Sequence, residues 1–128
     1  PLMSAEKKIL IVDDDAPLRE ALKEQFALLD EFEIVDVDTA AKGLESAKTG
    51  GFDLILLDTA MIEGDGAETA KIIRRLEEYS GRQALILGIE SSDADEELED
   101  KYRESGVNSF IKRPIDIETL KKHMEQRR

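Results

Sequence analysis

The chain contains no cysteine and no tryptophan among its 128 residues, and it has only 3 prolines. Without cysteine there is no disulfide, no thiol nucleophile and no thiolate metal ligand, so any chemistry must use oxygen and nitrogen groups. Aromatic residues make up 5% of the chain and hydrophobic residues 41%. We therefore expect one domain whose packed core is built mainly from aliphatic side chains.

The sequence also lacks long apolar segments. No run approaches the roughly 18 consecutive apolar residues that a membrane-crossing helix needs, and no charged-then-apolar leader is present. Together with the absence of cysteine, this pattern predicts a cytoplasmic protein. Because Pro1 and Leu2 precede Met3, we interpret residues 1–6 as a cloning remnant and lead-in, followed by a domain over residues 7–126.

Acidic side chains outnumber basic ones, 30 against 18, so the net charge is −12. This balance argues against a protein that binds the phosphate backbone of nucleic acids. Residues 93–104 hold seven acidic and two basic side chains, whereas residues 121–128 hold four basic and one acidic. We interpret both segments as solvated helix faces, with a docking surface for a partner as the alternative. His123 lies in the second segment and is interpreted as a surface residue.

Two kinds of periodicity alternate along the chain. Short apolar runs predict strands at residues 8–13, 32–37, 52–58, 84–89 and 107–111. Helical spacing and helix-stop residues predict helices at residues 17–29, 40–48, 67–79, 93–104 and 116–126. This alternation predicts an α/β fold, a doubly wound five-stranded parallel sheet of the (βα)5 type, covered by helices on both faces.

Polar side chains follow the ends of the strongest strands. They are Asp13, Asp14 and Asp15 after the first strand, Asp58 at the third, Ser91 and Ser92 after the fourth, and Lys112 and Arg113 after the fifth. The carboxyl ends of parallel strands share one edge of the sheet, and in the order 2-1-3-4-5 the first and third strands are neighbours. Ligands bind at that switch point, so the order predicts that Asp13, Asp14 and Asp58 lie together.

Clustered carboxylates repel each other, and a divalent cation relieves that repulsion. Oxygen ligands suit Mg²⁺, which commonly shares its coordination shell with a phosphate. A carboxylate in such a site can attack phosphorus and form an aspartyl phosphate. The cation, a basic side chain and a hydroxyl could then stabilise the transferring phosphoryl group.

Each of these residues also has an ordinary structural interpretation. Asp15 directly precedes a predicted helix, so a helix cap is its favoured role. Asp58 alone could be a turn residue, Ser91 a helix cap and Arg113 a surface charge. The functional hypothesis depends on the convergence of four strand ends at one edge.

With these residues in place, the chain resembles the receiver domain of two-component response regulators, over residues 7–126 and with a flavodoxin-like fold. In that family an acidic pair ends the first strand, as in ILIVDDD here, and the phosphoacceptor ends the third, as in DLILLD. The resemblance implies that Asp58 is the phosphoacceptor. It also implies Mg²⁺ binding by Asp14, Asp58 and the backbone carbonyl of Ala60, with Asp13 acting through water.

The resemblance also assigns residues near the end of the fifth strand. Residues 106–114 read GVNSFIKRP where the family reads G-A-D-D-Y-L-x-K-P, so Arg113 replaces the usual Lys and Phe110 is the switch aromatic. Ser91 stands 22 residues before Arg113, the family's spacing to its switch hydroxyl. The alternative cation, Lys112, would instead pair with Glu90, which has no hydroxyl.

Two departures from the family pattern are visible. Arg113 keeps the positive charge of the usual Lys, but it is longer and planar. Ile62 replaces the usual Pro in the loop DTAMIEGDG at residues 58–66, which should loosen that loop. As in the family, the bond before Pro114 is expected to be cis.

The resemblance implies a signalling domain, which is not an enzyme with a separate substrate although it catalyses its own phosphoryl transfer and dephosphorylation. A histidine kinase or phosphotransfer protein would donate the phosphoryl group, and a downstream output domain or protein would read the face of the last two helices and the strand between them. No nucleic-acid or membrane binding is expected, and the state would be monomer or weak dimer.

The main alternative is a pseudo-receiver, an interaction domain of the same fold that no longer uses phosphate. A Mg²⁺-dependent phosphohydrolase ranks lower, because it would need a second acid at the position of Ala60. A flavin-binding domain would need a phosphate-cradling loop after the first strand in place of three carboxylates.

Overall fold

The computed structural model describes residues 7–29, 31–61, 65–91 and 95–126. The predicted lead-in, residues 1–6, and the residues Ile62 and Ser92 lie outside this described part, so the interpretations placed on them stay predictions. Among the residues that the structure describes, no helix combines the length and the apolar character that a bilayer crossing would require.

Strands and helices alternate in the predicted order. The strands are β1 (Lys7–Val12), β2 (Phe32–Val37), β3 (Leu54–Asp58), β4 (Leu85–Glu90) and β5 (Ser109–Lys112). The helices are α1 (Ala16–Ala27), α2 (Ala40–Lys48), α3 (Gly66–Ser80), α4 (Glu96–Glu104) and α5 (Ile117–Glu125). All strand pairs are parallel and the sheet order is β2-β1-β3-β4-β5. The predicted fold class and strand order are confirmed.

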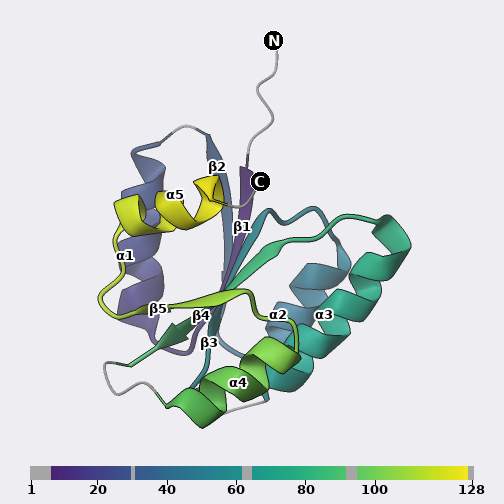
Figure 1. Ribbon diagram of the computed structural model, residues 1–128. Helices are drawn as coiled ribbons and strands as arrows, with labels where there is room; N and C mark the ends of the chain where they lie inside the picture. Colours follow the sequence, from purple (N-terminus) through teal and green to yellow (C-terminus); the bar gives the residue numbers. More distant parts are fainter. Residues whose placement is uncertain (1–6, 30, 62–64, 92–94, 127–128) are drawn as a thin grey trace.

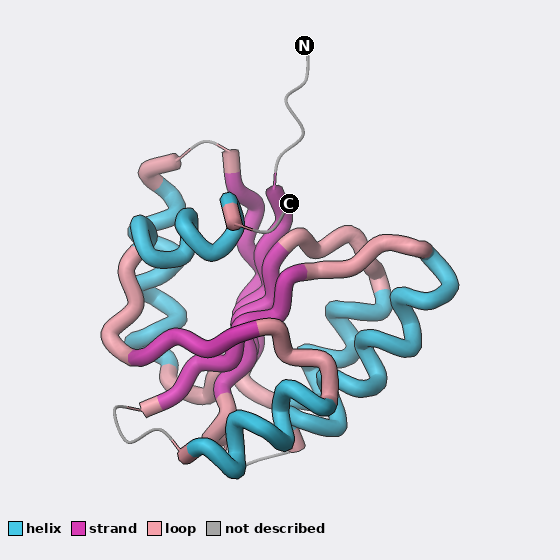
Figure 2. Tube along the Cα trace, in the orientation of Figure 1, coloured by secondary structure: helices cyan, strands magenta, loops and turns pink. Residues whose placement is uncertain are grey.

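The sheet lies between two layers of helices. Helices α1 and α5 cover one face, and α2, α3 and α4 cover the other (Figure 1). Figure 2 shows the strands running as one twisted layer between them. Side chains alternate along β1, so that Ile9 and Ile11 join the core under α1 and α5, whereas Leu10 and Val12 join the core under the other three helices. Both faces of the central strands are therefore buried, as their continuous apolar runs predicted.

Each helix begins at a capping side chain that follows a strand. The oxygen of each capping side chain accepts a hydrogen bond from a backbone N–H in the first turn of the helix. These caps are Asp15, Thr39, Asp65, Asp95 and Asp116. The interpretation of Asp15 as a helix cap is confirmed, because its Oδ1 accepts from the Leu18 N–H at 3.2 Å. The caps fix where the loops at the carboxyl edge of the sheet end.

Arg74 on α3 fastens this helix to the two strands beside it. Its guanidinium donates to the carbonyl oxygens of Ala84 at 2.8 Å and Gly106 at 3.0 Å, and to Asn108 Oδ1 at 2.7 Å. It also pairs with Glu77 at 2.7 Å, and its side chain is 17% exposed. A single side chain thus satisfies backbone groups that precede β4 and β5.

We predict that Arg74→Met will lower the free energy of unfolding by about 2–4 kcal/mol, because it leaves two carbonyls and a half-buried carboxylate without their charged donor. Urea denaturation followed by circular dichroism measures this. The matched control is Arg75→Met on the exposed side of the same helix, which should change stability by less than about 0.5 kcal/mol. Equal urea midpoints for the two variants would contradict the stabilising role that we assign to Arg74.

Candidate functional site

Three carboxylates meet at the carboxyl edge of the sheet. Asp13 follows β1 and Asp58 ends β3, and these strands are neighbours, with Val12 beside Leu57. One side-chain oxygen from each of Asp13, Asp14 and Asp58 lies within 4.8 Å of the others. Asp13 is fully buried and Asp58 is 3% exposed, whereas Asp14 is exposed. The predicted convergence of these three residues is confirmed.

Backbone hydrogen bonds fix the two buried carboxylates. Asp13 Oδ1 accepts from the Asp15 N–H at 2.9 Å, and Asp58 Oδ1 accepts from the Ala60 N–H at 2.8 Å. The carbonyl oxygen of Asp13 accepts from Arg19 Nη1 at 2.8 Å. Each carboxylate is therefore held by the turn that follows its own strand, which keeps the cluster in place.

Arg113 brings the positive charge to this cluster. Its Nη2 lies 2.8 Å from Asp13 Oδ2 and 3.4 Å from Asp58 Oδ2, and its Nη1 lies 3.3 Å from Asp15 Oδ2. The neighbouring Lys112 is exposed. Of the two candidate cations, Arg113 is the one whose side chain contacts the carboxylates. The bond between Arg113 and Pro114 is cis, as the resemblance implied.

The cluster resists complete ionisation. Burial, followed by the neighbouring Asp13 carboxylate, raises the pKa of Asp58 to about 7, against the opposing effects of the Ala60 N–H and Arg113. The neutral form of Asp58 is therefore more favoured than in an exposed aspartate. A divalent cation among these oxygens would favour the ionised form and so make Asp58 nucleophilic. The donor set, hard oxygen atoms held close together, fits Mg²⁺.

Two further predicted residues lie close to this edge. Ser91 is exposed and follows β4 directly, two residues beyond Ile89, the neighbour of Asp58 in the sheet. The ring of Phe110 packs over Gly88, where an added Cβ would lie 2.6 Å from the ring and 3.0 Å from Thr59 Cγ2. The side chains of Phe110 and Thr59, the residue that follows the candidate phosphoacceptor, therefore both lie against Gly88.

Sequence reasoning missed two residues that support the site. Arg19 bonds the Asp13 carbonyl and pairs with Asp36 on β2 at 2.9 Å. Tyr102 on α4 donates from its hydroxyl to the Thr59 carbonyl at 3.2 Å. The spacing of four residues between Leu98 and Tyr102 indicates that both face inward, but no pattern in the sequence reveals the partner of the hydroxyl.

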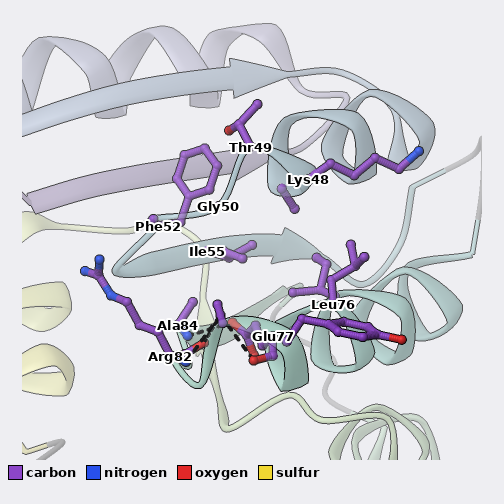
Figure 3. Close-up of a pocket in the computed structure, with 14 residues that line it drawn as sticks. Lys48, Thr49, Gly50, Phe52, Ile55, Leu76, Glu77, Arg82 and Ala84 are labelled. Carbon is purple, nitrogen blue, oxygen red and sulfur yellow. Dashed lines mark hydrogen bonds between the residues drawn. The ribbon is translucent and has the colours of Figure 1, made fainter.

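A separate hollow lies at the other end of the strands. It has a volume of about 510 Å³ and is formed where α2 ends, beside the second half of α3, with Thr49, Phe52, Leu76 and Arg82 in its lining. Figure 3 shows these side chains around the start of β3, with the bond from the Ala84 N–H to Glu77. None of the predicted site residues that the structure describes lines this hollow, so it is separate from the acidic cluster.

Comparison with known sequences points to one family. The sequence signature of the response regulator receiver domain matches residues 9–125. The chain is 33% identical over 121 residues to the transcriptional regulatory protein CiaR of Streptococcus pneumoniae, covering 92% of this chain and 50% of CiaR. It is 28% identical over 125 residues to the chemotaxis protein CheY-3 of Vibrio cholerae, covering 98% of this chain and 94% of CheY-3. The chain thus spans half the length of CiaR.

The fold is also shared with solved structures. The receiver domain of the histidine kinase CKI1 from Arabidopsis thaliana, solved with Mg²⁺ and BeF₃⁻, superposes with a TM-score of 0.84 at 21% identity, covering 94% of this chain and 91% of that one. At this identity the likeness shows the fold alone. With the acidic cluster at the carboxyl edge and the signature over residues 9–125, the chain belongs to the response regulator receiver domain family.

Proposed function

We propose that this domain accepts a phosphoryl group on Asp58 and uses it as a reversible signal. The observation that carries the proposal is the buried Asp58 carboxylate, whose oxygen lies within 4.8 Å of oxygens from Asp13 and Asp14. A cation stabilises a buried carboxylate that lies close to other carboxylates. The same cation would balance the negative charge of a phosphoryl group bound there.

The metal ligands in this proposal are Asp14, Asp58 and the carbonyl oxygen of Ala60, with Asp13 acting through a water molecule. When bound, Mg²⁺ would neutralise charge on the phosphoryl oxygens. The CKI1 receiver domain, which shares this fold, was solved with Mg²⁺ and BeF₃⁻. The same cation fits the oxygen donors of this chain.

The proposed transfer is an in-line displacement at phosphorus. A carboxylate oxygen of Asp58 forms the new P–O bond while the P–N bond of a phosphohistidine breaks, and the histidine nitrogen keeps the electron pair. Arg113, 3.4 Å from Asp58 Oδ2, would balance the charge of the phosphoryl group. Ser91 would donate its hydroxyl to a phosphoryl oxygen. Water attack on phosphorus would later restore the Asp58 carboxylate.

The phosphoryl donor would be a histidine kinase or a phosphotransfer protein in the cytoplasm. The output surface would be the α4-β5-α5 face, with Phe110 as the switch aromatic between Asp58 and that face. CiaR is a transcriptional regulatory protein of which this chain covers half, so a downstream output domain or protein fits the proposal. The domain itself would act as a monomer or weak dimer.

One observation favours the pseudo-receiver as a second candidate. Arg113 already contacts Asp13, Asp15 and Asp58, so it partly neutralises the cluster without a metal. An interaction domain that does not use phosphate would be stable in this state. Labelling with a small phosphodonor separates the two functions.

We predict that acetyl phosphate with Mg²⁺ will add one phosphoryl group to the native domain, and that the label will be lost at alkaline pH. Intact-mass spectrometry measures the gain. Asp58→Asn should gain nothing, because an amide oxygen is a poor nucleophile, whereas the control Asp100→Asn on the exposed face of α4 should label fully. If Asp58→Asn is labelled as fully as the native domain, another residue is the phosphoacceptor. If the native domain is not labelled, the pseudo-receiver is favoured.

We also predict that Mg²⁺ will stabilise the fold by mass action, by about 1.4 kcal/mol at a concentration ten times its Kd. Thermal unfolding with and without Mg²⁺ measures this gain as a rise in Tm. Asp14→Ala should lose most of the rise, because it removes one ligand. Glu24→Ala, an exposed acid on α1, should keep it. An unchanged rise in Asp14→Ala would show that Asp14 is not a ligand.

A further inference from the structure

Tyr102 is the residue through which α4 enters the core. It is 5% exposed and is the buried residue of this highly charged helix. Leu98, one turn earlier, packs partly against the same core cluster. The position of α4 on the domain therefore depends strongly on the contacts of the Tyr102 side chain.

The hydroxyl of Tyr102 reaches the chain next to the candidate phosphoacceptor. It donates to the carbonyl oxygen of Thr59 at 3.2 Å, across 43 residues of sequence. Gly66 at the start of α3 makes room for it, since a Cβ there would lie 2.7 Å from the Tyr102 oxygen. Burial, followed by the charges of Asp65 and Asp58, raises the pKa of Tyr102 to about 12, so the hydroxyl stays a donor.

Thr59 and Ala60 share the peptide unit that links this hydroxyl to Asp58. The carbonyl of the unit accepts from Tyr102, and its N–H, on Ala60, donates to Asp58 Oδ1 at 2.8 Å. The bond is trans, so the two groups point in opposite directions from one rigid plane. Thr59 itself is held by the Ile89 carbonyl, through its N–H at 3.0 Å and its hydroxyl at 3.1 Å.

We propose that Tyr102 is a positioning residue that couples α4 to the state of Asp58 through the Thr59–Ala60 peptide unit. This inference rests on the proposed function. When a carboxylate oxygen of Asp58 becomes part of an acyl phosphate, the acceptor of the Ala60 N–H changes. Because hydrogen bonds at the two ends of one peptide polarise each other, and because the plane turns as a unit, the bond to Tyr102 changes as well, and α4 responds.

This route differs from the one through Ser91 and Phe110. Phe110 lies on β5 with its ring over Gly88, whereas Tyr102 is hydrogen-bonded directly to the backbone of the loop after β3. Ser91 takes no part in the contact. A variant that lacks only the Tyr102 hydroxyl should therefore leave the phosphorylation chemistry intact and weaken the response of α4.

The test compares Tyr102→Phe with Tyr79→Phe, in which the hydroxyl removed belongs to a tyrosine that is 91% exposed. Beryllium trifluoride with Mg²⁺ imitates the aspartyl phosphate, and NMR records the amide shifts of α4 and of residues 58–60. Without the probe, the NMR chemical shift of the Thr59 carbonyl carbon should differ from the native value in Tyr102→Phe but not in Tyr79→Phe. With the probe, both variants should keep the responses at residues 58–60. The α4 response should fall to half or less in Tyr102→Phe and stay at the native value in Tyr79→Phe.

A second variant reaches the same bond from the other side. Gly66→Ala places a methyl group against the Tyr102 hydroxyl and should weaken the α4 response as Tyr102→Phe does. In the double variant the two changes should not add, because both remove one interaction. Additive losses would overturn the proposal, since they would mean that the two residues act separately.

The outcomes separate this inference from the proposed function. If the native domain shows the shifts at residues 58–60 and Tyr102→Phe keeps the full α4 response, the coupling through Tyr102 is wrong and the proposed function stands. If the probe leaves residues 58–60 of the native domain unchanged, both proposals are overturned. If Tyr102→Phe loses half or more of the α4 response while residues 58–60 still respond, the coupling is supported.

Discussion

The repulsion between buried carboxylates at the carboxyl edge of the sheet is the constraint on which the site depends. Asp13 and Asp58 are held in place by N–H groups of the turns that follow their own strands, so they cannot move apart to relieve it. Burial, and after it the Asp13 carboxylate, raises the pKa of Asp58, and Arg113 partly balances the charge by contacting three carboxylates. A divalent cation and a phosphoryl group would complete this balance of charge.

The same edge connects the candidate phosphoacceptor to helix α4. One peptide unit, between Thr59 and Ala60, donates to Asp58 on one side and accepts from Tyr102 on the other. Helix α4 carries many charges and enters the core chiefly through Tyr102. A small change at Asp58 can therefore bias the position of α4, which has few other buried contacts. The bias arises only if the change at Asp58 alters the difference in free energy between two positions of α4.

Much of the fold could be predicted because local patterns determine it. The runs ending in Asp13 and Asp58 are continuous and apolar, which is typical of strands buried on both faces, and the strand order then brings their ends together. Long side chains were harder to predict. The choice of Arg113 over Lys112 was available from the family spacing, but its contact with Asp15, and the partners of Arg74 and Tyr102, depend on three-dimensional packing that periodicity does not encode.

Reductive trapping of the phosphorylated domain identifies the residue that carries the phosphoryl group. Borohydride converts an aspartyl phosphate to homoserine, which peptide mass spectrometry locates in the sequence. After incubation with acetyl phosphate and Mg²⁺, we predict homoserine at position 58 and unchanged aspartates at positions 13 and 14. Homoserine at either of those positions, or its absence from position 58 in a protein that has gained a phosphoryl group, would show that Asp58 is not the phosphoacceptor.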